Sequence, residues 1–321
     1  MDLIYMNGSR RDIGVFPDYK LDLAYGKDEN NFELLIPSNQ HCCGSGFYLY
    51  VENTEYGGVI DSIQSDTDQQ EVTYSGRTWH GILDSKIIAP DAGSDYLILS
   101  GDANGVILNL LKRIGLDELF TVVGATSGLT ISNYKMPRYI HAYEGIRKML
   151  DSVSAKLTFR FVNGMVTLAA VLRVDYTQQE KFDSDKIGFK CKRNYRPVNH
   201  LICLGCGELA AREVVHLYVD PLGNISKTQT QTGLWERTEV YDYPNAESLI
   251  ELEQGGMERL KELAVADEIK INLTADDGGY DIQDIVGATD NITGLSAAAV
   301  IAKKIVTIDR GEVEISYEVE E

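Results

Sequence analysis

Long apolar runs are missing from this sequence. The longest near-continuous ones, residues 165–172 and 297–302, are far shorter than the ~20 residues that a helix needs to cross a bilayer. The N-terminus has no basic start followed by an apolar stretch, so no secretory signal is visible. We therefore expect no membrane insertion, and we expect synthesis in a bacterial host cytoplasm.

Proline, cysteine and basic residues are also scarce. Seven prolines and 44% hydrophobic residues in 321 exclude a mostly disordered or collagen-like chain. Five cysteines, an odd number, do not indicate a disulfide framework. Thirty Lys and Arg residues against 49 Asp and Glu give a net charge of −19. Such a surface repels phosphate backbones and anionic lipids, which disfavours sequence-specific nucleic-acid binding and membrane docking.

The usual catalytic signatures are absent as well. No H-E-x-x-H, G-x-S-x-G or P-loop pattern occurs, and the five histidines are scattered singly. His80, beside Trp79, lies in the one segment that resembles a binding loop, and a structural role is the more common one for such a histidine. Carboxylates are so numerous that a glycosidase pair cannot be recognised by spacing. The sequence predicts no catalytic, cofactor-binding or metal-binding residue.

One cysteine pair calls for a closer look. Cys203 and Cys206 form a C-x-x-C pair between His200 and His216. A structural zinc site needs four N or S ligands, usually in two clustered pairs. The second pair would be the two histidines, or Cys42-Cys43 with His41. Cys42 and Cys43 would point to opposite faces if they lay on a strand, which makes joint ligation awkward. Because Cys203 lies in an apolar run, we expect free structural thiols, with a zinc or redox site as the less favoured alternative.

Short β-rich segments fill the first ~90 residues. Most are bounded by Gly, Asn, Asp or Ser, a spacing typical of an all-β barrel or sandwich. The segments are 21–25, 32–36, 47–51, 58–63, 71–74 and 81–88.

After these segments, the spacing of the apolar residues changes from that of strands to that of helices. Apolar residues recur at helical spacing over 104–116 and again over 142–150, which predicts two amphipathic helices. Asn163-Gly164 follows between two β-prone runs and predicts a type I′ hairpin, because both central residues of that turn need positive φ. Residues 96–184 are therefore predicted to form a small α+β insertion.

The remaining residues, 185–321, return to β character with one helix near 245–265. Asn245 is the expected N-cap of that helix. Gly255-Gly256 predicts a kink or break, since each mid-helix glycine costs roughly 1 kcal/mol relative to alanine. In the last strand, apolar residues alternate with glutamates, so one face should belong to the core and the other should be almost entirely acidic.

Several segments together resemble a known family. They are 55–61, 74–83, 199–205, 208–212, 216–220, 241–248 and 303–306. In order and spacing they resemble the tail-tip, or baseplate hub, proteins of tailed phages and phage-like particles such as PBSX-like prophages and contractile bacteriocins. The resemblance extends over nearly the whole chain.

This resemblance implies an α+β, mainly β fold with two antiparallel β-barrel-like tube domains and an inserted small α+β domain. Residues 1–95 would supply most of the first tube domain, which residues from about 185–220 would complete. Residues 96–184 would be the insertion. Residues 185–321 would hold the remainder of the first tube domain and the second tube domain.

The resemblance also implies a function. Such proteins form a ring, typically a homotrimer, that joins the tail tube to the spike or tail tip at the tail tip or baseplate of the virion. The implied partners are further copies of this chain, a tail tube or distal tail protein, a spike or tail-tip protein and a tape-measure protein. No enzymatic activity and no cofactor are implied. The alternatives are a cell-wall polysaccharide or peptide hydrolase of the tail tip and a carbohydrate-binding adhesin.

The acidic balance suits a channel. Three copies would carry about −57 charges, and an acidic bore would keep DNA from adhering during passage. We expect Glu312, Glu314 and Glu318 to face that bore. Contacts between subunits should bury aromatic residues from the supply of 18 tyrosines.

Overall fold

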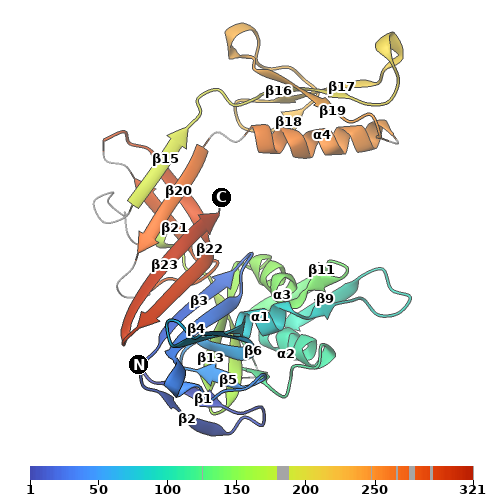
Figure 1. Cartoon of the computed structure of the whole chain (residues 1–321). Helices are drawn as coiled ribbons and strands as arrows, with labels where there is room; N and C mark the ends of the chain where they lie inside the picture. Colours follow the sequence, from blue (N-terminus) through green and yellow to red (C-terminus); the bar gives the residue numbers. More distant parts are fainter. Residues whose placement is uncertain are drawn as a thin grey trace. The chain divides into compact units, whose positions relative to one another are not determined.

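Strands dominate the structure, a computed structural model that describes residues 1–124, 126–178, 188–246, 248–264, 267–274, 279–289 and 292–320 (Figure 1). The predicted α+β, mainly β class is confirmed. The chain divides into two compact units. Unit 1 combines Met1–Phe189 with Ile271–Glu321, and unit 2 is Lys190–Lys270.

Unit 1 is built on one large antiparallel sheet. Its strands lie in the order β20-β23-β22-β3-β4-β7-β6-β5-β1-β2, with β21 added on β22. Their bounds are β1 Leu3–Met6, β2 Asp12–Phe16, β3 Lys20–Gly26, β4 Asn31–Pro37, β5 Tyr48–Tyr50, β6 Gly57–Asp66, β7 Glu71–Thr78, β20 Asp267–Thr274, β21 Ile285–Thr289, β22 Ser296–Asp309 and β23 Glu312–Glu320. The β22–β3 pair, with Val306 opposite Leu23, joins the C-terminal part of the chain to the N-terminal part.

Alternating apolar residues explain this sheet. Leu21, Leu23 and Tyr25 of β3 are all buried, and their neighbours Phe32 and Leu34 on β4 are buried on the same face. Side chains on a strand alternate between faces, so one face of the sheet packs in the core and the other carries the polar residues.

The prediction of a strand over 81–88 is wrong for most of its length. Residues Trp79–Asp84 form helix α1, and only Ile87–Ile88 form a short strand, β8. Thr78 caps the helix, because its hydroxyl accepts a hydrogen bond from the Gly81 N–H at 3.3 Å. Trp79 and Leu83, four residues apart, are both fully buried, so helical spacing serves the core here.

The region after α1 mixes helices and strands. Its elements are β9 Leu97–Asp102, α2 Ala103–Arg113, β10 Phe120–Val122, β11 Thr130–Met136, β12 Ile140–His141, α3 Ala142–Asp151, β13 Ala155–Val162, β14 Met165–Leu172 and the 3-10 turn η2 Tyr176–Gln178. Both predicted helices are confirmed. The predicted hairpin is confirmed too, since Asn163 (φ 52°) and Gly164 (φ 76°) join β13 to β14. These elements share one apolar core with α1 and β5.

Unit 2 is a four-stranded sheet with one helix packed on it. Strand order is β18-β17-β16-β19, with β16 and β19 parallel. The bounds are β16 His200–Leu204, β17 Val214–Val219, β18 Ile225–Ser226, β19 Thr238–Asp242 and α4 Leu249–Leu263. The short turns are η1 Ser38–Gln40 in unit 1 and, in unit 2, η3 Leu209–Ala211 and η4 Gly233–Trp235. Strand β15, Gly188–Arg193, and β20 each run across the boundary between the units.

Helix α4 corrects two expectations. It is continuous through Gly255-Gly256 rather than kinked, and its N-cap is Ser248, not Asn245. A Cβ atom added at Gly256 would lie 2.4 Å from the Cys203 sulfur, so the glycine allows the helix to approach β16 closely. In the part of the chain that the structure describes, no helix is long and apolar enough to cross a membrane.

Candidate functional site

The glutamates of the last strand lie on an open, acidic sheet face. In the register of β23 and β22, Glu312 lies opposite Asp309 and Glu318 opposite Lys303. Directly paired residues share a face of the sheet, and Glu312, Glu314 and Glu318 are exposed. We define the acidic face as the outward positions of β23, β22 and β3 that carry charge: Glu312, Glu314, Glu318, Glu320, Asp309, Asp22, Lys303 and Lys20.

Carboxylates outnumber cations on the acidic face by six to two. The cations are neutralised, because Lys303 pairs with Glu29 at 2.5 Å and Lys20 with Asp22 at 3.2 Å. Among the described residues, Glu312 and Glu314 form no ion pair. Three of the six carboxylates are paired: Asp22 with Lys20, Glu320 with Lys27 at 2.7 Å and Asp309 with Arg310 at 3.9 Å. The uncompensated negative charge therefore lies on Glu312, Glu314 and Glu318, none of which forms an ion pair with a described residue.

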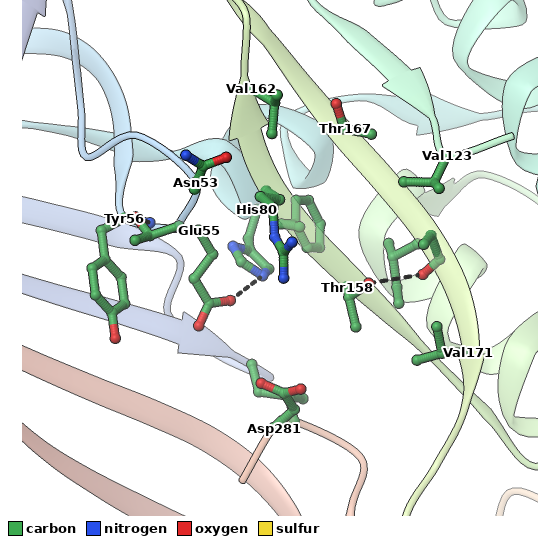
Figure 2. Close-up of a pocket in the computed structure, with 16 residues that line it drawn as sticks. Asn53, Glu55, Tyr56, His80, Val123, Thr158, Val162, Thr167, Val171 and Asp281 are labelled. Carbon is green, nitrogen blue, oxygen red and sulfur yellow. Dashed lines mark hydrogen bonds and ion pairs between the residues drawn. The ribbon is translucent and has the colours of Figure 1, made fainter. Parts of the chain in front are cut away.

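A pocket of about 800 Å³ opens on a different part of unit 1 (Figure 2). We call it the trough. One wall is the β13–β14 hairpin, whose residues Thr158, Arg160, Thr167 and Val171 line it. The other walls are residues 53–56 and 281–282, and His80 of α1 also lines it. The 53–54 loop is fixed to β13 by two backbone hydrogen bonds, at 2.9 and 2.8 Å, so this wall is anchored.

Five buried or half-buried charges form an ionic network beside the trough. Lys304 Nζ lies 2.6 Å from Glu55 Oε1 and 3.7 Å from Asp281 Oδ1. Lys156 Nζ lies 2.9 Å from Asp281 Oδ2 and 2.7 Å from Asp284 Oδ2. The side chains of Lys304, Lys156 and Asp284 are only 6%, 7% and 0% exposed. The network joins β22, β13, the loop before β6 and the loop before β21.

Burial and the neighbouring charges shift the pKa values of Lys304 and His80. Burial lowers the pKa of Lys304, but the nearby carboxylates of Glu55 and Asp281 outweigh it and hold that pKa above its usual value. Burial and the charge of Lys304 together hold the pKa of His80 well below its usual value. Both lysines are therefore charged and His80 is neutral at neutral pH.

His80 lies in an aromatic setting. Its ring centroid is 3.7 Å from that of Phe159 and 4.6 Å from that of Tyr25. His80 Nε2 is 3.8 Å from Glu55 Oε2, too far for a hydrogen bond. His80 Nδ1 is buried and has no hydrogen-bond partner among the described atoms.

This geometry favours a structural role over acid–base catalysis. Glu55 is engaged in an ion pair with Lys304, and Asp281 in ion pairs with Lys156 and Lys304. Neither His80 nitrogen is within hydrogen-bonding distance of a hydroxyl or thiol nucleophile in the described part of the chain. The described residues also contain no group of three or more His, Cys, Asp or Glu side chains placed to hold a metal ion.

The residues weighed for zinc are split between faces of the unit 2 sheet. His200 Nε2 and His216 Nδ1 are 2.8 Å apart, and His200 Nδ1 lies 2.7 Å from Glu236 Oε1. Cys203 is buried toward α4, and burial raises the pKa of its thiol to about 11. Cys206 is an exposed free thiol. The histidines meet each other but not the cysteines.

The ionic network was missed at the sequence level, although one signal was available. Lys304 has the same strand parity as Val306 and Ile308, which are fully buried, so a charge at that position predicts a buried partner. Nothing local identifies that partner as Glu55, 249 residues earlier.

The chain was compared with known proteins. No family model and no curated protein matches it. Two solved structures match over all of this chain: the 43 kDa tail protein of prophage MuSo2 from Shewanella oneidensis (13% identity, TM-score 0.53, 98% of that chain) and the tail protein from Neisseria meningitidis (13% identity, TM-score 0.50, 96% of that chain).

The chain shares the fold of these two tail proteins. At 13% identity the likeness concerns the fold, and at that level it confirms the resemblance to phage tail proteins inferred from the sequence segments. It also covers both units, since all of this chain is matched.

Proposed function

We propose that this chain is a structural protein of a phage-type tail, and that it forms a homotrimeric hub ring between the tail tube and the spike or tail tip. The observation that carries the proposal is the fold shared with two tail proteins over at least 96% of their length. The ring is placed at the tail tip or baseplate of a virion or phage-like particle. Its neighbours are a tail tube or distal tail protein, a spike or tail-tip protein and a tape-measure protein.

The acidic face supports a channel role. The unpaired carboxylates of Glu312, Glu314 and Glu318 repel a phosphate backbone, because DNA affinity depends on cations that displace its counterions. With this face turned toward the bore, DNA passes without adhering.

The charged residues of the trough favour this structural role over a hydrolase. A glycosidase needs one carboxyl free to donate a proton and a second free to attack or to activate water. Glu55 and Asp281 are instead bound to Lys304 and Lys156.

The test is the assembly state of the purified chain. Light scattering and mass photometry over a range of concentrations are expected to show a species of about 107 kDa, three times the 35.7 kDa chain. Negative-stain images of that species should show threefold rings with a central opening. A chain that stays monomeric at every concentration, or hydrolysis of purified cell wall that is lost on substituting Glu55 or Asp281, would contradict the proposal.

A further inference from the structure

Arg160 is a charged residue of the trough lining. Its guanidinium is exposed on β13 and forms neither an ion pair nor a hydrogen bond with any described residue. The other charged lining residues, Glu55 and Asp281, are neutralised by Lys304 and Lys156. Among the described residues that line the trough, Arg160 is therefore the one free cation, in a chain with nineteen more acidic than basic residues.

Two further polar side chains of the trough lining are uncommitted. The Thr167 hydroxyl, directly across the β13–β14 pair from Arg160, has no hydrogen-bond partner among the described residues. The Asn53 carboxamide on the opposite wall has none among the described residues either. These groups include several donors, which suit a carboxylate.

The remaining lining suits a chain segment rather than a small ion. Val123, Val162 and Val171 add aliphatic surface, and about 800 Å³ is room for several residues. Figure 2 shows Val162 and Val171 on the hairpin wall, Val123 on the segment after β10, and Asn53, Tyr56 and Glu55 on the facing wall.

We propose that the trough receives an acidic segment of a second copy of this chain, with Arg160 pairing with one of its carboxylates. Charge complementarity identifies the occupant, because exposed Asp and Glu residues are abundant on every copy whereas a free guanidinium in a pocket is not. The inference rests on the proposed ring and makes the trough one of its subunit contacts. An ion pair at such a contact sets the register of the subunits and slows their dissociation.

Charge reversal tests this contact. Arg160→Glu is compared with Arg11→Glu, the same change at an exposed arginine that does not line the trough. We expect at least a tenfold weaker assembly for Arg160→Glu by mass photometry and less than a twofold change for Arg11→Glu. Equal weakening by both variants would show a general charge effect and overturn the proposal. Circular dichroism and thermal melts establish that each variant is folded, and Arg160→Gln, expected to show a smaller loss, replaces Arg160→Glu where the reversal prevents folding.

Cross-linking identifies the occupant. Val171, 36% exposed at the trough, is replaced by the photoreactive residue benzoylphenylalanine. Irradiation of the assembled protein is expected to join two copies through a peptide that contains Asp or Glu. Cross-links only within one copy, or only to another tail component in intact particles, would overturn the assignment.

The two proposals fail differently. Normal rings from Arg160→Glu would refute the trough contact and leave the hub intact. Absence of assembly by the unaltered chain would refute the ring itself.

Discussion

The buried pair of Lys304 and Glu55 offers a strong test of how unit 1 is held together. We expect Lys304→Met to destabilise the protein severely. The substitution fills a similar volume but removes the charge 2.6 Å from Glu55. Glu55, only 16% exposed, is then left without its cation, while Asp281 keeps its contact with Lys156.

The magnitude follows from that geometry. Breaking one side of a buried ion pair costs about 3–5 kcal/mol, mostly because the remaining charge is buried and unpaired. Residual exposure of Glu55 places the expected loss near 3 kcal/mol, a large share of a typical stability of about 5–15 kcal/mol. Glu55→Gln should be similarly costly, and the double variant should cost clearly less than the sum of the two.

Urea unfolding followed by circular dichroism measures these losses. A matched control is Lys148→Met, which breaks an exposed i,i+4 pair with Glu144. Both side chains of that pair are about half exposed, so we expect less than about 1 kcal/mol. A second readout is the imidazole of His80 by NMR: removing Lys304 removes a charge that lowers the His80 pKa, which should therefore rise. The reasoning is refuted if Lys304→Met costs no more than Lys148→Met.

Three further predictions concern other features. Burial holds the pKa of His80 well below its usual value, so between pH 7 and 5 only the unfolded chain takes up a proton at this histidine. The free energy of unfolding should therefore fall between pH 7 and 5 by roughly 1–2 kcal/mol more in the unaltered protein than in His80→Asn. Urea titrations at both pH values measure this difference. Gly256→Ala should destabilise unit 2 by about 1–3 kcal/mol despite alanine's helix propensity, because its Cβ meets the Cys203 sulfur; Cys203→Ala should restore part of the loss, and a neutral Gly256→Ala would contradict the close approach. Changing Glu312, Glu314 and Glu318 together to Lys should leave the melting temperature nearly unchanged while creating salt-sensitive DNA binding in gel shifts, and no gain in binding would count against the acidic face as a repulsive surface.

Local patterns were sufficient to predict strands β3 to β7, the β13–β14 hairpin, helices α2 and α3 and the last two strands of unit 1. Alternation along β3 and β23 identified strands, and the Asn163-Gly164 pair identified a hairpin because positive φ is a property of those two residues. Helices α2 and α3 followed from their apolar stripes. In each case the deciding interaction lies within a few residues of sequence.

Predictions failed where the deciding contact is distant. The glycines of α4 weaken an isolated helix, and only the Cys203 sulfur of β16 explains why the helix continues through them. Residues 81–88 have strand composition, yet Thr78 capping and the burial of Trp79 make most of them helical or turn. For the trough, Arg160 and Thr167 belong to a hairpin that was predicted, but its facing wall comes from residues 53–56 and 281–282.

The ionic network explains how the C-terminal segment of unit 1 pairs in the correct register with strands far earlier in the sequence. Residues 190–270 form unit 2, so residues 271–321 must pair in register with strands that precede unit 2 in the sequence. Apolar pairing alone tolerates a two-residue shift along a strand, because side chains repeat with that period. Lys304 tolerates no such shift, since it would move its charge away from Glu55 and bury it unpaired. Asp281 and Asp284 are constrained in the same way, because both form ion pairs with Lys156 on β13. Charge pairing thus selects one register for β22 against β3, and with it the outward set of residues that makes up the acidic face.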